Sequence, residues 1–282
     1  MNNGEQVGEL VVTEPWTGQS ARLFEEGRAH RLVLNYALGF NEPTLDFLHG
    51  LPIRELEIID RRLNTLEPIY SLAPTLESLQ LTTHPDLTIQ LTEFPKLRDL
   101  GASWAQVRDT IGQTSGLEDL FLLAYMPDNL EPLSSHSGLQ NLRMKDRPKV
   151  KSLAGLSQLP RLQRLGIYLA SRLDDISELR GRSEIREVEL VSCKKLTRID
   201  DLADCTGLRR LNIAESGDIE SLKPLAGLNL LEELYLDGTT KILDRDLTPI
   251  KGLRRLRSFA MMNRRGYEPS VKDVKRLIQG LT

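Results

Sequence analysis

The chain contains 282 residues, of which 27% are charged and 40% hydrophobic, and its formal net charge is −3. This composition is ordinary for a soluble globular protein, and the small net charge excludes a strong overall attraction to DNA, RNA or anionic membranes. Two cysteines are too few for a disulfide scaffold.

The first residues, MNNGEQVGELVV, lack a basic segment followed by an apolar one, so we expect no secretory signal. No apolar run approaches the roughly 18–20 residues needed to cross a bilayer, and no Asn-x-Ser/Thr glycosylation acceptor occurs. With the low cysteine count, these features predict a cytoplasmic protein without membrane contact. An export route that uses no signal peptide would leave the same features.

Residues 1–28 carry apolar side chains without any repeat register. These are Leu10, Val11, Val12, Trp16, Leu23 and Phe24. The first unit of a repeat array exposes an apolar face that another segment must cover. We therefore predict that residues 1–28 form an N-terminal cap.

From residue 29 to residue 262 the pattern L-x-x-L-x-L recurs about eleven times, at spacings of about 20 to 25 residues, which lie within the range of leucine-rich repeats. The clearest copies are Leu162-Leu165-Ile167, Ile185-Val188-Leu190, Leu208-Leu211-Ile213 and Leu231-Leu234-Leu236. A repeat array grows as one elongated unit because each repeat contacts only its neighbours. We therefore expect a solenoid over residues 29–262.

The repeat that begins at Ile185 shows the expected architecture of each unit. Val188 and Leu190 alternate with outward residues, as in a short strand with one buried face. The apolar residues that follow come every third residue, at Leu196, Ile199, Leu202 and Cys205. This period suits an extended or 3₁₀-like return. Stacked repeats should form a parallel sheet with strands about 4.8 Å apart.

Residues 263–282 are predicted to form a C-terminal capping helix. Ser270 and Asp273 resemble a capping box. Apolar residues follow at helical spacing, namely Val271, Val274, Leu277, Ile278 and Leu281. We expect this stripe to cover the last repeat, since terminal repeats need a polar outer surface. A helix that binds a partner is the alternative.

The 22–24 residue period and blocks such as IESLKPLAGLNLLEELYLDGT (residues 219–239) resemble the internalin-type, short-repeat leucine-rich repeat proteins of bacteria. The resemblance covers residues 29–262. It implies an α/β repeat solenoid, a right-handed superhelix with a parallel concave β-sheet and a 3₁₀ or irregular convex side. It also implies that the chain binds another protein, without indicating which one.

One position departs from that family. The family usually has Asn eight residues after the first Leu of each repeat, where its side chain satisfies backbone groups of the turn. This chain has Arg61, His84, Ala105, Tyr125, Arg147, Ala170, Cys193, Ser216 and Thr239 there. We expect the turns to satisfy their backbone groups in another way.

No constellation in the sequence predicts catalysis, a cofactor or a metal site. The four histidines, His30, His49, His84 and His136, form no metal-spaced pair, and no nucleotide-binding or hydrolase motif occurs. Cys193 and Cys205 fall on inward positions, which favours buried packing over a reactive thiol. We therefore expect no enzyme, although catalytic groups from distant repeats could still converge.

Side chains two, four and six places after each first Leu should point together out of the concave sheet. This places an aromatic and basic patch in the middle of the face, made of Phe121, Leu123, Arg143, Lys145, Arg164 and Tyr168, with Trp104 at the strand edge one repeat away. Exposed aromatic residues beside Arg are typical of interface hot spots. In the alternative interpretation, Trp104 and Tyr125 fold inward to fill space left by Ala105 and the missing Asn.

Two further features border this patch. Gly101 and Gly166 should leave shallow depressions. An acidic stretch follows toward the C-terminus, with Glu187, Glu189, Glu233 and Asp237, and Tyr235 lies in the same outward rows. Charges of this kind would orient a partner and raise its association rate.

These observations predict a non-catalytic module that binds a protein partner on its concave sheet, as an adaptor, an inhibitor or an immunity-type factor. The alternative is a binder of nucleic acid or a small anionic ligand through Arg143, Lys145, Arg164 and Arg210, against which the net charge argues. The partner's identity stays open, and so does the oligomeric state, for which a monomer is the expectation.

Overall fold

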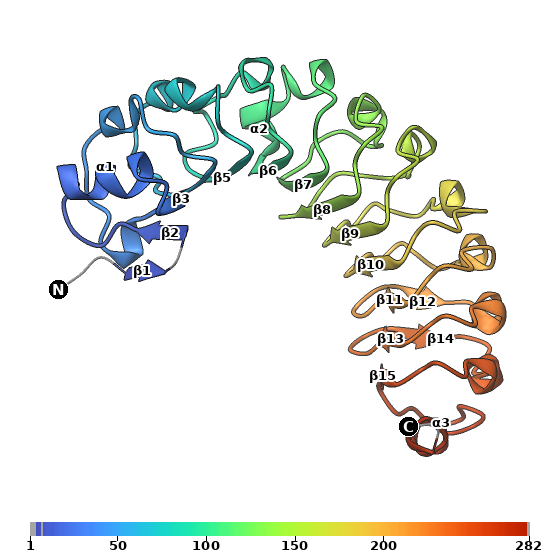
Figure 1. Ribbon diagram of the computed structural model, residues 1–282. Helices are drawn as coiled ribbons and strands as arrows, with labels where there is room; N and C mark the ends of the chain where they lie inside the picture. The colour runs from blue at the N-terminus through green and yellow to red at the C-terminus, as the bar shows by residue number, and fades with distance from the viewer. Residues whose placement is uncertain (1–3, 7, 281–282) are drawn as a thin grey trace. The chain divides into compact units, whose positions relative to one another are not determined.

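In the computed structural model, which describes residues 4–6 and 8–280, short β-strands alternate with short 3₁₀ turns (Figure 1). The chain divides into two compact units, Met1–Leu122 (unit 1) and Leu123–Thr282 (unit 2). Within each unit the strands of consecutive repeats pair in parallel. This is the leucine-rich repeat architecture that the periodicity predicts.

Unit 1 begins with residues that extend its sheet. Strands β1 (Gly4–Gln6) and β2 (Gly8–Val11) pair antiparallel, and β2 pairs parallel with β3 (Ala29–Asn35). Between β2 and β3 lies helix α1 (Gly18–Glu25), whose N-cap Thr17 accepts a hydrogen bond from the Ser20 amide. Leu10, Leu23 and Phe24 are buried. The segment predicted as a cap therefore contributes two strands to the sheet as well as a helix.

The repeats of unit 1 follow in order. Its strands are β4 (Glu55–Ile59), β5 (Ser78–Thr82) and β6 (Asp99–Ser103), and β7 (Asp119–Leu123) lies where the two units meet in the sequence. The returns contain η1 (Tyr36–Leu38), η2 (Asp46–Leu48), η3 (Glu67–Leu72), η4 (Leu91–Glu93), helix α2 (Trp104–Val107) and η5 (Ile111–Gln113). The register joins Leu56 to Leu79 and Leu79 to Leu100, as the repeat spacing predicts.

Unit 2 repeats the same plan, with strands along one side and 3₁₀ turns along the other (Figure 1). Its main strands are β8 (Asn141–Lys145), β9 (Arg164–Tyr168), β10 (Glu187–Val191), β11 (Arg210–Asn212), β13 (Glu233–Leu236) and β15 (Ser258–Met261). Its turns are η6 (Glu131–Leu133), η7 (Leu156–Gln158), η8 (Ser177–Leu179), η9 (Asp200–Leu202), η10 (Lys223–Gly227) and η11 (Thr248–Gly252). Strands β12 (Asp218–Ile219) and β14 (Lys241–Ile242) form a separate parallel pair.

The inward positions of the repeat form the core, as predicted. In the repeat that begins at Ile185, Val188, Leu190, Leu196, Ile199, Leu202 and Cys205 are each at most 1% exposed. Each such side chain contributes about 1.5–3 kcal/mol of burial free energy relative to an exposed one. Because one repeat cannot enclose its own apolar side chains, this stabilisation depends on the neighbouring repeats.

Hydroxyl groups take over part of the role of the missing Asn ladder. The Cys193 amide donates to Ser216 Oγ over 3.1 Å, and Ser216 Oγ donates to the Leu190 carbonyl over 2.7 Å. The Ser216 amide in turn donates to Thr240 Oγ1 over 2.9 Å. The turn backbone is therefore satisfied by small side chains from the next repeat.

The predicted ladder register is wrong by one residue in five repeats. The buried residues are Asp60, Thr83, Trp104, Pro148 and Thr240, in place of Arg61, His84, Ala105, Arg147 and Thr239. The shift does not follow repeat length, since the repeats that begin at Ile53, Leu139 and Leu162 have the same spacing of 23 and bury Asp60, Pro148 and Ala170, at three different offsets.

Helix α3 (Val271–Gln279) lies within the segment predicted to form a C-terminal capping helix. The side chain of its N-cap, Ser270, accepts a hydrogen bond from the Asp273 amide over 3.2 Å. Val271, Val274 and Ile278 are buried, and the helix contacts β15 and η11 of the last repeat. Leu277 is 38% exposed, which differs from the predicted stripe, and Leu281 lies outside the described residues. Over residues 4–6 and 8–280, no helix is long and apolar enough to cross a membrane.

Candidate functional site

The parallel register of unit 2 brings the predicted outward rows together on one surface, which we call the sheet face. One row runs through Asn141, Arg164, Glu187, Arg210, Glu233 and Ser258, and the next through Arg143, Gly166, Glu189, Asn212, Tyr235 and Ala260. Adjacent members of a row come from neighbouring strands, so their side chains lie within contact distance. These rows confirm the prediction for the strands of unit 2.

Tyr168, at the end of β9, lies along the sheet face. A Cβ atom at Gly166 would be 3.0 Å from Cε2 of the Tyr168 ring and 3.5 Å from Cγ of Arg143. The ring and the Arg143 stem therefore occupy the depression that the sequence predicted at Gly166. Lys145 Nζ lies over the ring, 5.0 Å from its centroid, a cation–π contact.

The Tyr168 hydroxyl connects β9 to β10 through a short hydrogen bond to Glu189. The pKa of Tyr168 is raised mainly because the ring is partly buried. The hydrogen bond to the Glu189 carboxylate and the negative charge of that carboxylate raise it further. The phenol therefore keeps its proton and remains the donor in this bond at neutral pH.

Arg210 is the central cation of the sheet face. Its Nε donates to Glu189 over 3.1 Å, and its Nη1 donates to Glu233. Burial lowers the pKa of Arg210, but the hydrogen bond and charges of Glu189 and Glu233 outweigh this effect and raise it. One guanidinium thus holds two carboxylates on neighbouring strands, the fork geometry for which Arg is suited.

Tyr235 extends the same network toward β15. The Arg210 guanidinium lies over its ring, 5.0 Å from the centroid. Its hydroxyl is 3.0 Å from both Glu233 Oε2 and Ser258 Oγ. The sequence prediction placed Tyr235 and the acidic residues in one region but did not reveal that Arg210 links them.

A connected series of side chains therefore crosses the sheet face from β8 to β15. It consists of Lys145, Tyr168, Glu189, Arg210, Glu233, Tyr235 and Ser258, and we call it the face network. Arg164 and Glu187 form a separate pair at 3.2 Å beside it. The predicted residues Arg143, Lys145, Arg164, Tyr168, Glu187, Glu189 and Tyr235 all lie on this face of unit 2.

Trp104 does not lie on an exposed edge, so that prediction is wrong. It is the first residue of α2 and is only 8% exposed. Its indole fits the alternative interpretation, in which a bulky ring fills the volume left by Ala105. Tyr125 also points inward, with no exposed surface, and its hydroxyl donates to the Asn129 carbonyl over 2.8 Å.

Phe121 and Leu123 are half-buried on β7, but they fall on different sides of the boundary between the units. Phe121 belongs to unit 1, and its grouping with Arg143 and Tyr168 stays a prediction. Leu123 belongs to unit 2.

The sheet face of unit 1 has a different charge pattern. Arg31 lies 2.8 Å from Glu9, 2.7 Å from Glu57 and 3.7 Å from Glu55. Further along, Asp99 accepts hydrogen bonds from Ser78 and Gln80 at 2.8 and 3.0 Å. Carboxylates therefore dominate this face, and Arg31 is shared among three of them.

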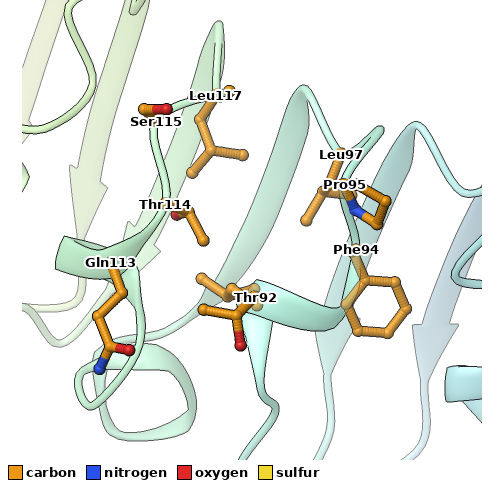
Figure 2. Close-up of a pocket in the computed structure, with 10 residues that line it drawn as sticks. Thr92, Phe94, Pro95, Leu97, Gln113, Thr114, Ser115 and Leu117 are labelled. Carbon is orange, nitrogen blue, oxygen red and sulfur yellow. The ribbon is translucent and has the colours of Figure 1, made fainter.

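A pocket of about 360 Å³ lies in unit 1 between η4 and η5, on turn residues away from the strands (Figure 2). Leu91, Phe94, Leu97 and Leu117 form its apolar part, and Thr92, Gln113, Thr114 and Ser115 form its polar part. None of the residues that line it is charged. Its volume is at the lower end for small-molecule sites, and it suits an uncharged group.

The groups that could carry chemistry are dispersed or buried. Among the residues that the structure describes, no group of three or more His, Cys, Asp or Glu could hold a metal ion. Cys193 and Cys205 are free and buried, and burial raises their pKa values to about 12 and about 11. Both thiols therefore stay protonated at neutral pH, as the packing interpretation expects.

The fold is that of leucine-rich repeat proteins, and solved structures agree. An internalin of Listeria monocytogenes matches with a TM-score of 0.63 at 20% identity, over 87% of this chain and 72% of that one. Internalin C2 of the same organism matches with a TM-score of 0.48 at 20% identity, over 69% of this chain and 76% of that one. A complex of TLR13 with a single-stranded RNA matches with a TM-score of 0.50 at 20% identity, over 86% of this chain and 33% of that one.

No protein-family model and no curated protein matches the sequence. The resemblance to internalins is confirmed as a likeness of fold, and the particular function has to come from this chain's own surface.

Proposed function

We propose that the protein is a non-catalytic recognition module that binds a protein partner on the sheet face of unit 2. The observation that carries this proposal is the face network, in which two aromatic rings, Arg210 and two carboxylates are held together across neighbouring strands. Tyr and Arg are the residue types enriched in interface hot spots. Their arrangement suits an adaptor, an inhibitor or an immunity-type factor.

The contacts within the network support binding because they order the side chains before a partner arrives. Tyr168 is fixed by Gly166, Lys145 and Glu189, and Tyr235 by Arg210 and Glu233. Ordering a flexible side chain on association costs about 0.5–1.5 kcal/mol. A surface that is already ordered avoids much of that cost.

The alternative of a nucleic-acid binder has less support. Carboxylates on this face engage at least two of its four cations, since Arg164 pairs with Glu187 and Arg210 pairs with Glu189 and Glu233. Those carboxylates would also repel phosphate groups.

We also propose a cytoplasmic location. The two cysteines are buried and free, which suits a reducing compartment. Cell fractionation that recovers the protein with the cytosol would support this location, and recovery outside the cell would contradict it.

Affinity capture from a lysate of the source organism tests the recognition proposal. The wild type would be compared with a Tyr168→Ala/Tyr235→Ala variant and with a matched Leu243→Ala/Leu277→Ala variant, which truncates two exposed residues elsewhere on unit 2. We expect a protein that the wild type and the matched control retain and the Tyr variant loses, because hot-spot truncation costs at least about 2 kcal/mol. Equal retention by all three would contradict the proposal.

A further inference from the structure

A basic and partly apolar edge borders the sheet face at the carboxyl ends of β8 and β9. The chain segment RMKDRPKVK, residues 143–151, leaves β8 and carries five cations and one carboxylate. Arg172 lies in the corresponding loop after β9. We call the residues Lys145, Arg147, Lys149, Leu169 and Arg172 the basic edge.

The structure places these loops side by side. The register of β8 and β9 pairs Met144 with Ile167, and an isolated parallel bridge pairs Ser152 with Asp175. The residues between these two fixed points, 145–151 and 168–174, therefore run alongside each other. Lys145 is next to Tyr168, and Lys149 occupies the same repeat position as Arg172.

The cations of the basic edge are exposed to solvent. Lys151, just beyond it, is paired with Asp128 at 2.7 Å. Lys145 lies over the Tyr168 ring, but Arg147 and Lys149 form no ion pair with the described residues. The carboxylates in the two loops are Asp146 and Asp174, so cations outnumber them.

Leu169 is an exposed apolar residue in the middle of these cations. It is 48% exposed and has a left-handed φ of 62°, a conformation that bulky residues seldom adopt. Met126, two repeats earlier and also in unit 2, is 58% exposed. Ala124, Asp146, Ser192 and Glu215 share this left-handed conformation after other strands, so it belongs to the turn of the repeat. The exposure of a leucine at this position is the feature that the fold's own packing does not require.

We propose that the basic edge binds an acidic, extended segment of the partner polypeptide, with an apolar side chain of that segment on Leu169. This inference rests on the proposed function, because the basic edge adjoins the face network through Lys145 and Tyr168. Acidic side chains complement Arg147, Lys149 and Arg172, and the apolar contact supplies affinity that charge alone does not give.

A polypeptide fits this surface better than a nucleic acid. Lys145 lies over one face of the Tyr168 ring, so less of the ring is open for base stacking. Glu187 and Glu189 border the cations on the sheet face. A nucleic acid carries a negative charge on every phosphate and would meet these carboxylates, whereas a polypeptide can place uncharged residues beside them.

The test is fluorescence anisotropy with three labelled probes of equal length. They are a Glu-rich peptide with interspersed leucines, the same peptide with every Glu replaced by Gln, and an oligouridine of matched charge. Four proteins would be compared, each checked for folding by circular dichroism. They are the wild type, the edge variant Arg147→Glu/Lys149→Glu, the control Arg254→Glu/Arg255→Glu with the same net charge, and the face variant Tyr168→Ala/Tyr235→Ala.

We expect the Glu-rich peptide to bind the wild type and the control more tightly than the Gln peptide and the oligouridine. The edge variant should bind it about tenfold more weakly, since reversing two rim charges changes both attraction and association rate. The milder Arg147→Gln/Lys149→Gln variant should show a smaller loss in the same direction.

Three results would overturn the inference. If the edge variant and the control bind the Glu-rich peptide with equal affinity, the basic edge is not the binding site. If only the face variant loses binding, the proposed function is supported and this inference is not. Tighter binding of the oligouridine would assign the basic edge to nucleic acid. If neither peptide binds better than the other, the inference fails, while the capture experiment still decides the proposed function on its own.

Discussion

The sheet faces of the two units are built from the same repeat pattern and differ in the side chains that they present. In unit 1, Arg31 is surrounded by Glu9, Glu55 and Glu57, and the outward rows of β3–β6 carry no aromatic residue. In unit 2, Arg210 lies between two carboxylates and over the Tyr235 ring, and Tyr168 lies close by. The inward positions of the repeat build the same core in both units, so the outward rows are free to differ.

This difference indicates where recognition lies. An acidic face with one shared cation attracts cationic groups in general. Ordered aromatic rings with alternating charges can instead discriminate between partners by the shape and charge of their surfaces. The comparison predicts that core substitutions act alike in both units and that surface substitutions act differently.

The largest effect should come from core truncation. Leu56→Ala in unit 1 and Leu211→Ala in unit 2 each remove a side chain that is at most 1% exposed. Each should lower the free energy of unfolding by about 2–5 kcal/mol, because the surrounding repeats relax only partly around the cavity. Urea unfolding measures the cost, and Leu277→Ala on the exposed side of α3 is the control. A cost in one unit far below that in the other would break the claim that the cores are alike.

The next effect is alkaline destabilisation of unit 2, the unit that holds both cysteines. Burial raises the pKa values of Cys193 and Cys205 from 9.0 to about 12 and about 11. Since the unfolded thiols ionise first, stability is fully present below about pH 9 and is lost as pH rises through the folded pKa values. Linkage gives a loss of roughly 3–4 kcal/mol for Cys193 when its titration is complete.

Urea unfolding across this pH range would measure the loss, with Cys193→Ala/Cys205→Ala as the comparison. Tyr125 and Tyr168, whose pKa values are also raised by burial, contribute alkaline loss in both proteins. The wild type should therefore lose more stability than the variant between pH 9 and 12. Identical slopes, or rapid reaction of the folded protein with a thiol reagent at pH 8, would contradict the burial of both thiols.

Removal of the shared cation should have an intermediate effect. Arg31→Ala and Arg210→Ala each leave neighbouring carboxylates without their common partner. Both guanidinium groups are about one-third exposed, so solvent reduces the cost to about 1–2 kcal/mol. Arg198→Ala, which removes a fully exposed cation beside Asp200 and Glu220, should change stability far less than either of these substitutions. Only Arg210→Ala should also weaken partner capture, and an equal effect of Arg31→Ala on capture would remove the distinction between the faces.

The smallest effect concerns Leu169. It shares a left-handed backbone with Ala124, Asp146, Ser192 and Glu215 at the ends of the other unit 2 strands. Asn tolerates this conformation better than Leu, so Leu169→Asn should raise stability by about 0.5–1 kcal/mol. The same substitution should weaken binding of the Glu-rich peptide. A variant that is more stable and binds unchanged would show that Leu169 has no role in recognition.

The repeat period was enough to predict the strands, the core and the outward rows, because each of these depends only on position within the repeat. Helix α3 was predicted for a similar reason, from Ser270 and the spacing that follows it. The position of Tyr168 over Gly166 had a sequence signal too, since residues two apart on a strand share a face and a glycine leaves room for a neighbouring ring.

Side-chain direction in the turns could not be predicted in this way. Trp104 turns inward and Thr83 replaces His84 because the position of the bend after each strand varies by a residue between repeats, and a fixed offset from the first Leu ignores that. The basic edge was missed although the run RMKDRPKVK is visible in the sequence. The outward rows end at Lys145, so the loop cations after it were not counted as part of the same surface.

The central claim is that the sheet face of unit 2 is the recognition surface, and hydroxyl-radical footprinting of the captured complex tests it most directly. Oxidation of Tyr168, Leu169 and Tyr235 would be compared with and without the partner, and exposed Tyr36 and Leu243 would serve as internal references. The account predicts protection of the first three side chains and unchanged oxidation of the two references. Protection at Tyr36 or around Phe94 in the unit 1 pocket, with Tyr168 and Tyr235 unchanged, would contradict it.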